Sequence, residues 1–457
     1  MSLASIQKIE SNLKDRIHQA IEKAKREGIS QVEIYGAYGE SIEGSIEKND
    51  VNTFASNEET NFGIRVIESG KEGFVTTNDV DTLDQSIRDA LALAKSSPSS
   101  DPDRELPEFL SLEPMPIEYY DETDELDEGF IADEIQNILN IRKTEYPYIS
   151  LDNASVSVSR GFRIILSSKG IYASEFGNGI DSSFFGMALE KEKVSSFDYD
   201  SAEGDVLADY KKDFRFKFDR FAKSLFDSLH AVNIPSKSVN IYLPPRSVFP
   251  FFLGMLFSQL NGYALRMGKS KFKDSLGKQV ASQLLTIQDL PRMFGRKNST
   301  WFDREGQPTS DKTVLENGVL KTFYYNHYEA KKAGLQHSNG SAVGGSGSLP
   351  GAGPKQIQVV KGTTPLSHFF EKEPALLVHR FSGTSDAISG DFSGVVKGGY
   401  LIENGNRTPV KEVQVRGNFF ETLNKIASIS SETEILNRSS EIPHVLLSNF
   451  SVIGKDE

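Results

Sequence analysis

Apolar residues recur every three or four positions in five stretches of the chain, which predicts amphipathic helices with one buried face. These stretches are residues 3–24, 82–94, 130–139, 210–229 and 244–260. Gly28 follows the first as a C-cap, and Thr82 with Gln85 three residues later has the spacing of a capping box at the start of the second. A further short helix is predicted at residues 418–426.

Alternating apolar and polar residues predict antiparallel strands between these helices. The strand pattern covers residues 32–36, 62–66, 149–189, 238–243 and 314–324, with shorter strands near Val359, Leu377, Phe392, Leu401 and Val413. Turns are predicted at residues 68–71, 168–170, 177–179 and 317–318, the last being an Asn-Gly hairpin signal. The fold class that follows is α+β: an N-terminal lobe of helices and antiparallel strands, then a C-terminal α+β domain of mostly antiparallel strands.

Two breaks in this pattern divide the chain into three modules, residues 1–107, 108–232 and 233–457. Residues 96–107 form a polar linker rich in Ser and Pro, and residues 234–237 interrupt the pattern before the last module. We expect the first two modules to form one lobe. Residues 338–353 are rich in Gly and Ser, and both a functional lid and a disordered loop fit this composition.

Charge and composition argue against several classes of function. The formal net charge is −13 at pH 7, which disfavours a general nucleic-acid binder. Because the chain has no cysteine, it has no disulfide, no thiolate zinc ligand and no cysteine nucleophile. The sequence does not open on a basic segment followed by an apolar one, and no apolar run approaches the ~18 residues of a membrane span. We therefore expect a soluble, cytoplasmic protein without a direct nucleic-acid or membrane partner.

Motifs for zinc or serine catalysis are weak. None of the seven histidines is followed by Glu, so the chain contains no His-Glu-x-x-His motif. Ser-x-x-Lys occurs at Ser45/Lys48 and at Ser275/Lys278, but the other elements of penicillin-recognising enzymes do not accompany it. The acidic run at residues 121–128 fits no EF-hand spacing and is interpreted as the N-terminus of a helix.

Asp303 and Glu305 place two carboxylates close together in a turn that ends at Gly306. One interpretation is an acid–base pair in a cleft. The other, which we favour, is a structural turn in which the aspartate accepts hydrogen bonds from its own backbone and the glycine takes a positive φ.

Six short motifs follow one another in the third module: GKSKF at 268–272, GKQVA at 277–281, FDREG at 302–306, ENGVL at 316–320, GDFS at 390–393 and IENG at 402–405. Earlier in the chain stand NFGIRV at 61–66, GF at 73–74 and SSKG at 167–170. Nearly end to end, this series resembles the TldD/PmbA family, and specifically its PmbA (TldE) branch. Each motif alone is weak, and the order of all six makes the resemblance specific.

The resemblance implies a two-subunit metallopeptidase, in which the TldD-type subunit holds zinc through a His-Glu-x-x-x-His helix and a later Cys. A gapless match places that helix at residues 253–258 of this chain. Leu253 and Ser258 then stand at the two histidine positions and Gly254 at the glutamate position, while residues 438–441 occupy the region of the Cys. These side chains offer neither a zinc site nor a carboxylate to activate water. The resemblance thus carries over the architecture and not the catalytic zinc.

The function implied is a non-catalytic PmbA/TldE-type subunit of a heteromeric TldD–TldE zinc metallopeptidase that acts on unfolded proteins or peptides. Zinc is expected in the TldD-like partner, no cofactor and no metal in this chain, and a homodimer of the isolated chain stays open. Two alternatives also stay open: a self-sufficient hydrolase with a non-zinc site, and a protein-binding modulator of DNA gyrase or of a toxin system. No catalytic residue is assigned. The predicted cleft residues are Gly268, Lys269, Ser270, Phe272, Asp303, Glu305, Gly306, Gly390, Asp391 and Ser393.

Overall fold

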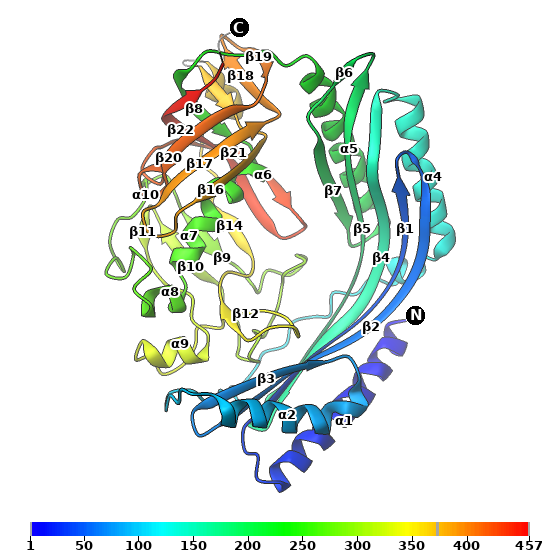
Figure 1. The fold of residues 1–457 in the computed structure, drawn as a ribbon, viewed down its shortest axis with the longest axis vertical. Helices are drawn as coiled ribbons and strands as arrows, with labels where there is room; N and C mark the ends of the chain where they lie inside the picture. The colour runs from blue at the N-terminus through cyan, green and yellow to red at the C-terminus, as the bar shows by residue number, and fades with distance from the viewer. Residues whose placement is uncertain (1, 372–373, 456–457) are drawn as a thin grey trace.

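Two large sheets organise the chain in the computed structural model, which describes residues 2–371 and 374–455 (Figure 1). The first sheet is long and curved, and it faces a C-terminal domain built on the second. The structure is 27% helix and 39% strand, and most strand pairs are antiparallel. The predicted α+β class is confirmed.

The curved sheet has the strand order β3-β2-β1-β4-β5-β6, with β7 also paired to β5. Its longest strands span up to 19 residues, which makes two long antiparallel hairpins. The strands are β1 Val32–Glu47, β2 Asp50–Glu68, β3 Lys71–Thr77, β4 Ile149–Ser167, β5 Tyr172–Glu190, β6 Lys193–Val194 and β7 Asp198–Gly204.

Successive side chains of a strand point to opposite faces of the sheet, so the even- and odd-numbered residues of each strand lie on different faces. In β1 and β4 the even-numbered apolar residues, such as Ile34 and Ile164, are buried under helices. The odd-numbered Tyr35 and Ile165 instead pack with Phe302 of the C-terminal domain. One face of the sheet is therefore covered by helices, and the other is turned toward the C-terminal domain.

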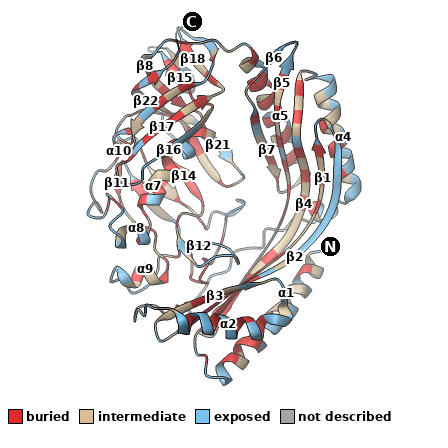
Figure 2. Cartoon of the chain, viewed as in Figure 1, coloured by how far each residue is buried: buried red, intermediate tan, exposed pale blue. Residues whose placement is uncertain are grey.

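The helices cover the sheet in two groups. One group packs on the half of the sheet that contains β3, and the other packs on the half that contains β7. The phenylalanine stripe of α5, which includes Phe214, Phe218 and Phe221, is fully buried beneath β5 (Figure 2). The helices are α1 Leu3–Arg26, α2 Leu83–Ser96, α3 Asp121–Asp124, α4 Glu128–Thr144 and α5 Leu207–Leu229, with a 3₁₀ turn at Val80–Thr82.

The second sheet has β8 and β22 at its centre and follows the order β11-β10-β9-β14-β22-β8-β15-β18-β19, with β16, β17, β20 and β21 attached beside this path. Its strands are β8 Lys237–Leu243, β9 Ile287–Asp289, β10 Lys312–Glu316, β11 Val319–Leu320, β14 Ile357–Val359, β15 Ala375–Leu377, β16 Arg380–Ser385, β17 Asp391–Lys397, β18 Gly399–Glu403, β19 Asn406–Val410, β20 Val413–Asn418, β21 Ile426–Leu436 and β22 Ser440–Ile453. A separate small hairpin consists of β12 Ala342–Val343 and β13 Gly351–Ala352.

Short helices pack against the second sheet. The predicted helix at 244–260 is present, but it changes pitch on the way: a π turn interrupts it at Pro250, which has no N–H to donate within an α-helix. Its apolar face joins the largest core of the molecule. The helices are α6 Pro245–Val248, the π turn Phe249–Leu253, α7 Gly254–Gln259, α8 Gly262–Arg266, α9 His327–Lys332 and α10 Phe419–Thr422, with a 3₁₀ turn at Leu366–Phe370.

Three local predictions are wrong in detail. Residues 177–179 do not turn, because β5 continues through them with Gly177 paired to Gly161 of β4. Thr82 precedes α2 but makes no capping bond, since its hydroxyl donates to the Asp79 carbonyl instead. The helix predicted at 418–426 ends at Thr422, and the long strands β21 and β22 follow it.

Candidate functional site

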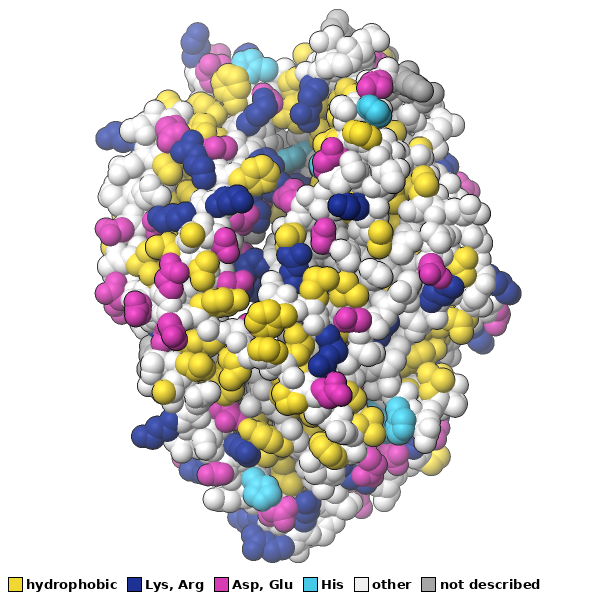
Figure 3. Space-filling view, turned by 180° about the vertical axis from the view of Figure 1, so that it is seen from behind, with side chains coloured by type: hydrophobic (Ala, Val, Ile, Leu, Met, Phe, Trp, Pro, Cys, Tyr) yellow, Lys and Arg dark blue, Asp and Glu magenta, His cyan; other side chains and the backbone are white. Residues whose placement is uncertain are grey.

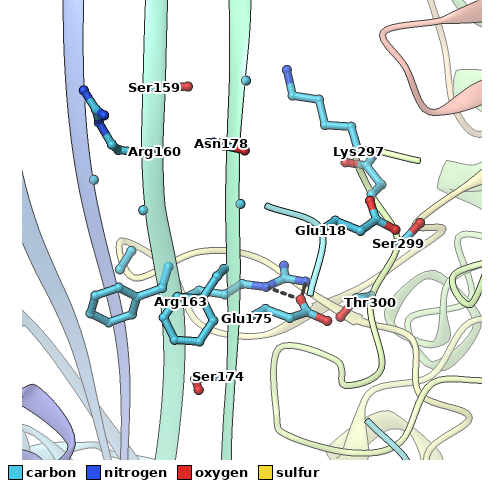
Figure 4. A pocket seen from close by; sticks show the side chains of 18 of the residues that line it. Glu118, Ser159, Arg160, Arg163, Ser174, Glu175, Asn178, Lys297, Ser299 and Thr300 are labelled. Carbon is cyan, nitrogen blue, oxygen red and sulfur yellow. Dashed lines mark hydrogen bonds and ion pairs between the residues drawn. The ribbon is translucent and has the colours of Figure 1, made fainter. Parts of the chain in front are cut away.

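A groove of about 1280 Å³ separates the curved sheet from the C-terminal domain (Figure 4). We call it the central groove. One wall is the open face of β1, β2, β4 and β5, and the other is formed by residues 297–301, 342–344 and 354–355 together with Arg438. Residues 114–118, which precede α3, also line it.

Charged side chains in the central groove hold one another in place. Arg163 on β4 donates from Nε to Glu175 of β5 over 2.9 Å, and the other carboxylate oxygen of Glu175 accepts the Trp301 N–H at 3.0 Å (Figure 4). Lys297 lies between two carboxylates, with Nζ 3.1 Å from Asp181 and 3.0 Å from Glu203. The groove thus presents carboxylates, cations and hydrogen-bonding groups of mixed sign rather than one strong charge, which is compatible with an extended ligand such as a peptide backbone.

A second, smaller pocket of about 460 Å³ opens beside α7. Gly254 and Ser258, two of the three positions matched to the zinc motif, line it together with Phe251 and Phe381. The third position, Leu253, is fully buried in the core of the C-terminal domain. The Ser258 hydroxyl donates to a backbone carbonyl one turn earlier, that of Met255, at 2.7 Å.

The loops that carry the GKSKF and GDFS motifs meet next to this pocket. The Nζ of Lys271 donates to the Ser389 carbonyl at 3.1 Å, and Phe272 packs edge-on against Phe420 with ring centroids 5.6 Å apart. Gln259 at the end of α7 connects both loops, because it accepts from the Lys271 N–H at 3.0 Å and donates to the Ala387 carbonyl at 2.8 Å. The structure therefore brings these two predicted segments together.

Most predicted cleft residues in these loops have structural contacts. Gly268 and Gly390 have positive φ angles, which glycine adopts without a steric cost. Ser270 accepts the Phe272 N–H, Asp391 accepts from Asn418, and Ser393 accepts from Gln414. Lys269 lies over the ring of Tyr263. None of these residues lines the central groove. Whether they take part in a cleft remains a prediction.

The third predicted segment, residues 303–306, lies elsewhere and forms the expected structural turn. Asp303 accepts hydrogen bonds from the N–H groups of Glu305 at 2.9 Å and Gln307 at 3.0 Å, and Gly306 has a φ of +70°. A Cβ on Gly306 would lie 2.3 Å from the side chain of Ile171, so the turn also fits closely against the curved sheet.

Burial perturbs two titratable groups near this turn. It raises the pKa of Asp303 to about 6 and lowers the pKa of Lys355 to about 8. Lys355 lies on the wall of the central groove and donates from Nζ to the Ala342 carbonyl at 2.8 Å. Asp303 does not line the groove among the described residues, so it is not positioned to act on a ligand there.

Among the ion pairs that join the curved sheet and its helices to the C-terminal domain, two buried clusters lie toward opposite ends of the sheet, and we call them junctions. In the first, the Arg65 junction, Glu305 lies 2.9 Å from Nη1 of Arg65, and Arg304 lies 2.9 Å from Glu33. All four side chains are almost completely buried. Arg65 also contacts Glu72 at 2.7 Å, and the second oxygen of Glu305 accepts the His327 N–H. The predicted residue Glu305 therefore has a structural partner in the other lobe.

In the second, the Asp198 junction, one buried carboxylate on β7 receives two side chains from the C-terminal domain. Asp198 lies 2.9 Å from Nε2 of His379 and 3.0 Å from Nε of Arg380. Nη1 of Arg246 lies 3.2 Å from the same imidazole nitrogen. Burial lowers the pKa of His379. Burial acts to raise the pKa of Asp198, but the neighbouring His379, Arg380 and Arg246 outweigh it and hold that pKa below its ordinary value.

Sequence reasoning missed the Asp198 junction and the central groove. Asp198 and His379 are 181 residues apart, so no local spacing signals their contact. A signal for the groove does exist, since Ser159, Arg163 and other odd-numbered polar residues of β4 alternate with buried ones.

Comparison with known proteins agrees with this architecture. Residues 236–454 match the model of the PmbA/TldA metallopeptidase C-terminal domain, and residues 32–94 match that of PmbA/TldA metallopeptidase domain 1. The chain belongs to the PmbA/TldD family. Among members of this family, it is 23% identical to the metalloprotease PmbA homologue of Haemophilus influenzae, over 99% of this chain and 98% of that protein. It is 25% identical to a metalloprotease TldD homologue of Buchnera aphidicola, over 82% of this chain and 79% of that protein.

Solved structures of PmbA/TldD proteins share the fold. TldE from Thermococcus kodakarensis superposes with a TM-score of 0.85 at 20% identity, covering 96% of this chain and 100% of that one. A proposed modulator of DNA gyrase from Thermotoga maritima superposes with a TM-score of 0.82 at 21% identity, covering 96% of this chain and 99% of that one. At this identity the likeness establishes the fold.

The metallopeptidase name of the PmbA/TldD family raises the question of whether this chain offers a metal site. At the matched helix it does not, because Leu253 and Gly254 have no ligand atom in their side chains and the Ser258 hydroxyl is a poor zinc ligand. Within residues 2–371 and 374–455, no three His, Asp or Glu side chains converge in a way that would hold a metal ion. In the same residues, no helix is long and apolar enough to cross a membrane.

Proposed function

We propose that this chain is the non-catalytic, PmbA/TldE-type subunit of a heteromeric TldD–TldE zinc metallopeptidase. The TldD-like partner supplies the zinc and the catalytic groups. This chain completes the cleft that receives unfolded proteins or peptides and stabilises the catalytic subunit.

The main support for the proposal is the set of side chains at and just before α7, none of which is a histidine or a carboxylate. Leu253, the last residue of the π turn before α7, is buried in the core, and α7 lines the second pocket with Gly254 and Ser258. No carboxylate in this helix can activate water, and no imidazole can bind zinc. The helix therefore supports the fold here and performs no chemistry.

The central groove supports the substrate part of the proposal. Its volume of about 1280 Å³ accommodates several residues of an extended chain, and hydrogen-bonding side chains from both lobes reach it. Such a lining, in which Arg163 and Lys297 are already paired with carboxylates, favours contacts to a peptide backbone over contacts to one particular side chain.

The test measures cleavage of unfolded casein together with bound zinc, for this chain alone, for the TldD-like protein of the same cell alone, and for their mixture. We expect zinc and full activity in the mixture, reduced activity in the TldD-like protein alone, and neither in this chain alone. Zinc-dependent cleavage by this chain alone would overturn the proposal.

A matched pair of variants separates the rival hydrolase. If Asp303 acted as a catalytic acid, Asp303→Asn would abolish any cleavage by the isolated chain, whereas the exposed Asp274→Asn would leave it unchanged. We expect the isolated chain to be inactive with or without either substitution. In the mixture both variants are expected to support cleavage in proportion to the amount of folded chain.

A further inference from the structure

Lys355 lies on the wall of the central groove, in the segment that joins β13 to β14. Its backbone is held on both sides, because its N–H donates to the buried Asp289 at 3.2 Å and its carbonyl accepts from Asn298 at 3.2 Å. Pro354, whose φ is fixed by its ring, precedes it. The fold therefore sets the position of this lysine before any ligand arrives.

Lys355 differs from the other cations of the groove. Six basic side chains line the groove within the described residues, and five of them form ion pairs with carboxylates of the chain. The five are Arg160, Arg163, Lys297, Arg304 and Arg438. The sixth, Lys355, pairs with no carboxylate of the described residues, and its Nζ has the Ala342 carbonyl as its one acceptor there, at 2.8 Å. An ammonium group has three N–H donors, so two of those of Lys355 are left for a ligand.

Asp303 is an incomplete counter-ion for this lysine. Burial lowers the pKa of Lys355 to about 8, and the neighbouring Asp303 offsets that lowering only in part. Both oxygens of Asp303 already accept backbone N–H groups, one from Glu305 and Gln307 and the other from Ala342. Because its pKa lies above 7, Lys355 is mostly cationic at neutral pH, and a carboxylate in the groove can complete its neutralisation.

We propose that the Nζ of Lys355 binds one carboxylate of a peptide in the central groove, supplied by the C-terminus of the peptide or by an aspartate or glutamate side chain. The wall beside it, residues 342–344 and Pro354, carries no charge that would repel such a group. Elsewhere in the groove, five basic side chains are outnumbered by seven acidic ones among the described residues, which disfavours a carboxylate there.

The outer surface offers little competition for an anionic group. Figure 3 shows acidic and basic side chains interspersed over the back of the molecule, so among the described residues of that face a carboxylate meets no large basic area. Within the groove, a charge-assisted hydrogen bond to Lys355 would fix which residue of the peptide lies at this wall. The inference rests on the proposed function and deepens it, because backbone contacts bind a chain of any sequence and Lys355 sets its register.

The first test compares three peptides of about ten alanine, serine and valine residues, each with a neutral dye at its N-terminus. One ends in a free carboxylate, the second is amidated, and the third is amidated and contains one central glutamate. By fluorescence anisotropy with the purified full-length chain, we expect a Kd about tenfold lower for a carboxylate peptide than for the amidated peptide without glutamate. A gain with the free acid alone assigns the site to a C-terminus, and a gain with the glutamate peptide assigns it to acidic side chains as well or instead. Equal Kd values for all three would overturn the inference.

Variants at residue 355 identify the group responsible. Lys355→Met removes the ammonium and keeps an unbranched apolar chain, Lys355→Arg keeps a cation, and Lys361→Met changes an exposed lysine that does not line the groove. We expect Lys355→Met to bind the three peptides with equal Kd, and Lys355→Arg and Lys361→Met to keep the preference. A preference for the carboxylate that persists in Lys355→Met would overturn the inference.

The wild-type chain offers a test that needs no substitution. Near pH 8 a large share of the Lys355 amine is neutral and can react with an acetylating reagent, and mass spectrometry reports its modification. We expect the carboxylate peptide that binds more tightly to slow acetylation of Lys355 several-fold and to leave Lys361 unchanged. Equal acetylation of Lys355 with and without that peptide would overturn the inference.

These outcomes separate the inference from the proposed function. Peptides that bind without any preference for a carboxylate would overturn the role of Lys355 and leave the proposed subunit role intact. No binding of any of the three peptides by this chain would overturn its role in receiving peptides, and the inference with it.

Discussion

The Arg65 and Asp198 junctions use opposite arrangements of charge. At the Arg65 junction one arginine is shared by Glu33, Glu72 and Glu305. At the Asp198 junction one aspartate is shared by His379 and Arg380. The first joins carboxylates to guanidinium groups, and the second includes an imidazole, whose pKa is lowered by burial. We therefore expect the contact at the Asp198 end of the curved sheet to weaken in acid.

The largest expected effect is the loss of the shared cation at the Arg65 junction. Arg65→Ala leaves Glu305 buried without its cationic partner and leaves Glu33 with Arg304 alone. Breaking a buried pair in this way typically costs about 3–5 kcal/mol of unfolding free energy. Urea denaturation measures it. The control is Arg16→Ala, because Arg16 pairs with Asp81 in an exposed position and its loss should cost less than about 1 kcal/mol. Equal losses of unfolding free energy in the two variants would show that the Arg65 junction stabilises the fold no more than an exposed ion pair does.

A smaller loss is expected at the Asp198 junction. Asp198→Asn keeps the shape of the side chain but removes the charge that His379 and Arg380 contact, which should cost about 2–3 kcal/mol. The Asp198 junction is less completely buried, since the side chains of Arg380 and Arg246 retain 10% and 15% of their exposure. Urea denaturation under the same conditions measures this loss of unfolding free energy. A loss larger than that of Arg65→Ala would show that the Asp198 junction contributes more to stability than the Arg65 junction.

Acid should weaken the Asp198 junction first. The folded chain holds the pKa of His379 below its ordinary value of 6.5, so the unfolded chain binds the proton more readily and stability falls as the pH drops below about 6.5. Between pH 7 and 5 we expect His379→Gln to lose about 1 kcal/mol less than the wild type. Asp198, with its lowered pKa, contributes only below its ordinary value near 3.8 and does not affect this window. Identical slopes in the two proteins would show that the junction does not respond to acid.

The smallest expected effect is the coupling between the junctions. Glu33 of the Arg65 junction lies near the start of β1. Asp198 lies on β7, which is next to β5 at the opposite end of the curved sheet. The two junctions therefore share no contact. Distant sites usually add to within about 0.5 kcal/mol, and the double variant Arg65→Lys/Asp198→Asn should therefore cost the sum of the two single variants. A larger deviation in a double-mutant cycle would mean that the sheet transmits strain from one end of the groove to the other.

Sequence alone predicts the parts of this fold that repeat locally. The stripe of Phe214, Phe218 and Phe221 gives α5 because a helical face repeats every three or four residues, and Asn317-Gly318 gives its hairpin because the turn requires positive φ at both residues. The prediction failed at Gly177, since two glycines near each other also suit a long strand that packs closely against its neighbour. The strand β22 went unassigned although it occupies the centre of the second sheet.

The candidate site was less accessible to sequence reasoning. Asp303 and Gly306 were interpreted correctly as a turn because the bonds that close the turn lie within five residues, although Asp303 also accepts the N–H of the distant Ala342. The partner of Glu305 is Arg65, 240 residues away, and a contact of that separation leaves no periodic signal. For the same reason the groove emerged only once the curved sheet and the C-terminal domain were placed together.

The position of β22 has a consequence for synthesis. The strands of the curved sheet end at Gly204, so they can pair with one another while the ribosome is still translating the remainder. The C-terminal sheet cannot do so, because β8 near residue 240 must wait for β22 at residues 440–453 to become its neighbour. During that interval the apolar face of α6 and α7 has no completed sheet to cover it. We therefore expect this half of the molecule to expose apolar surface on the ribosome until β22 has been translated.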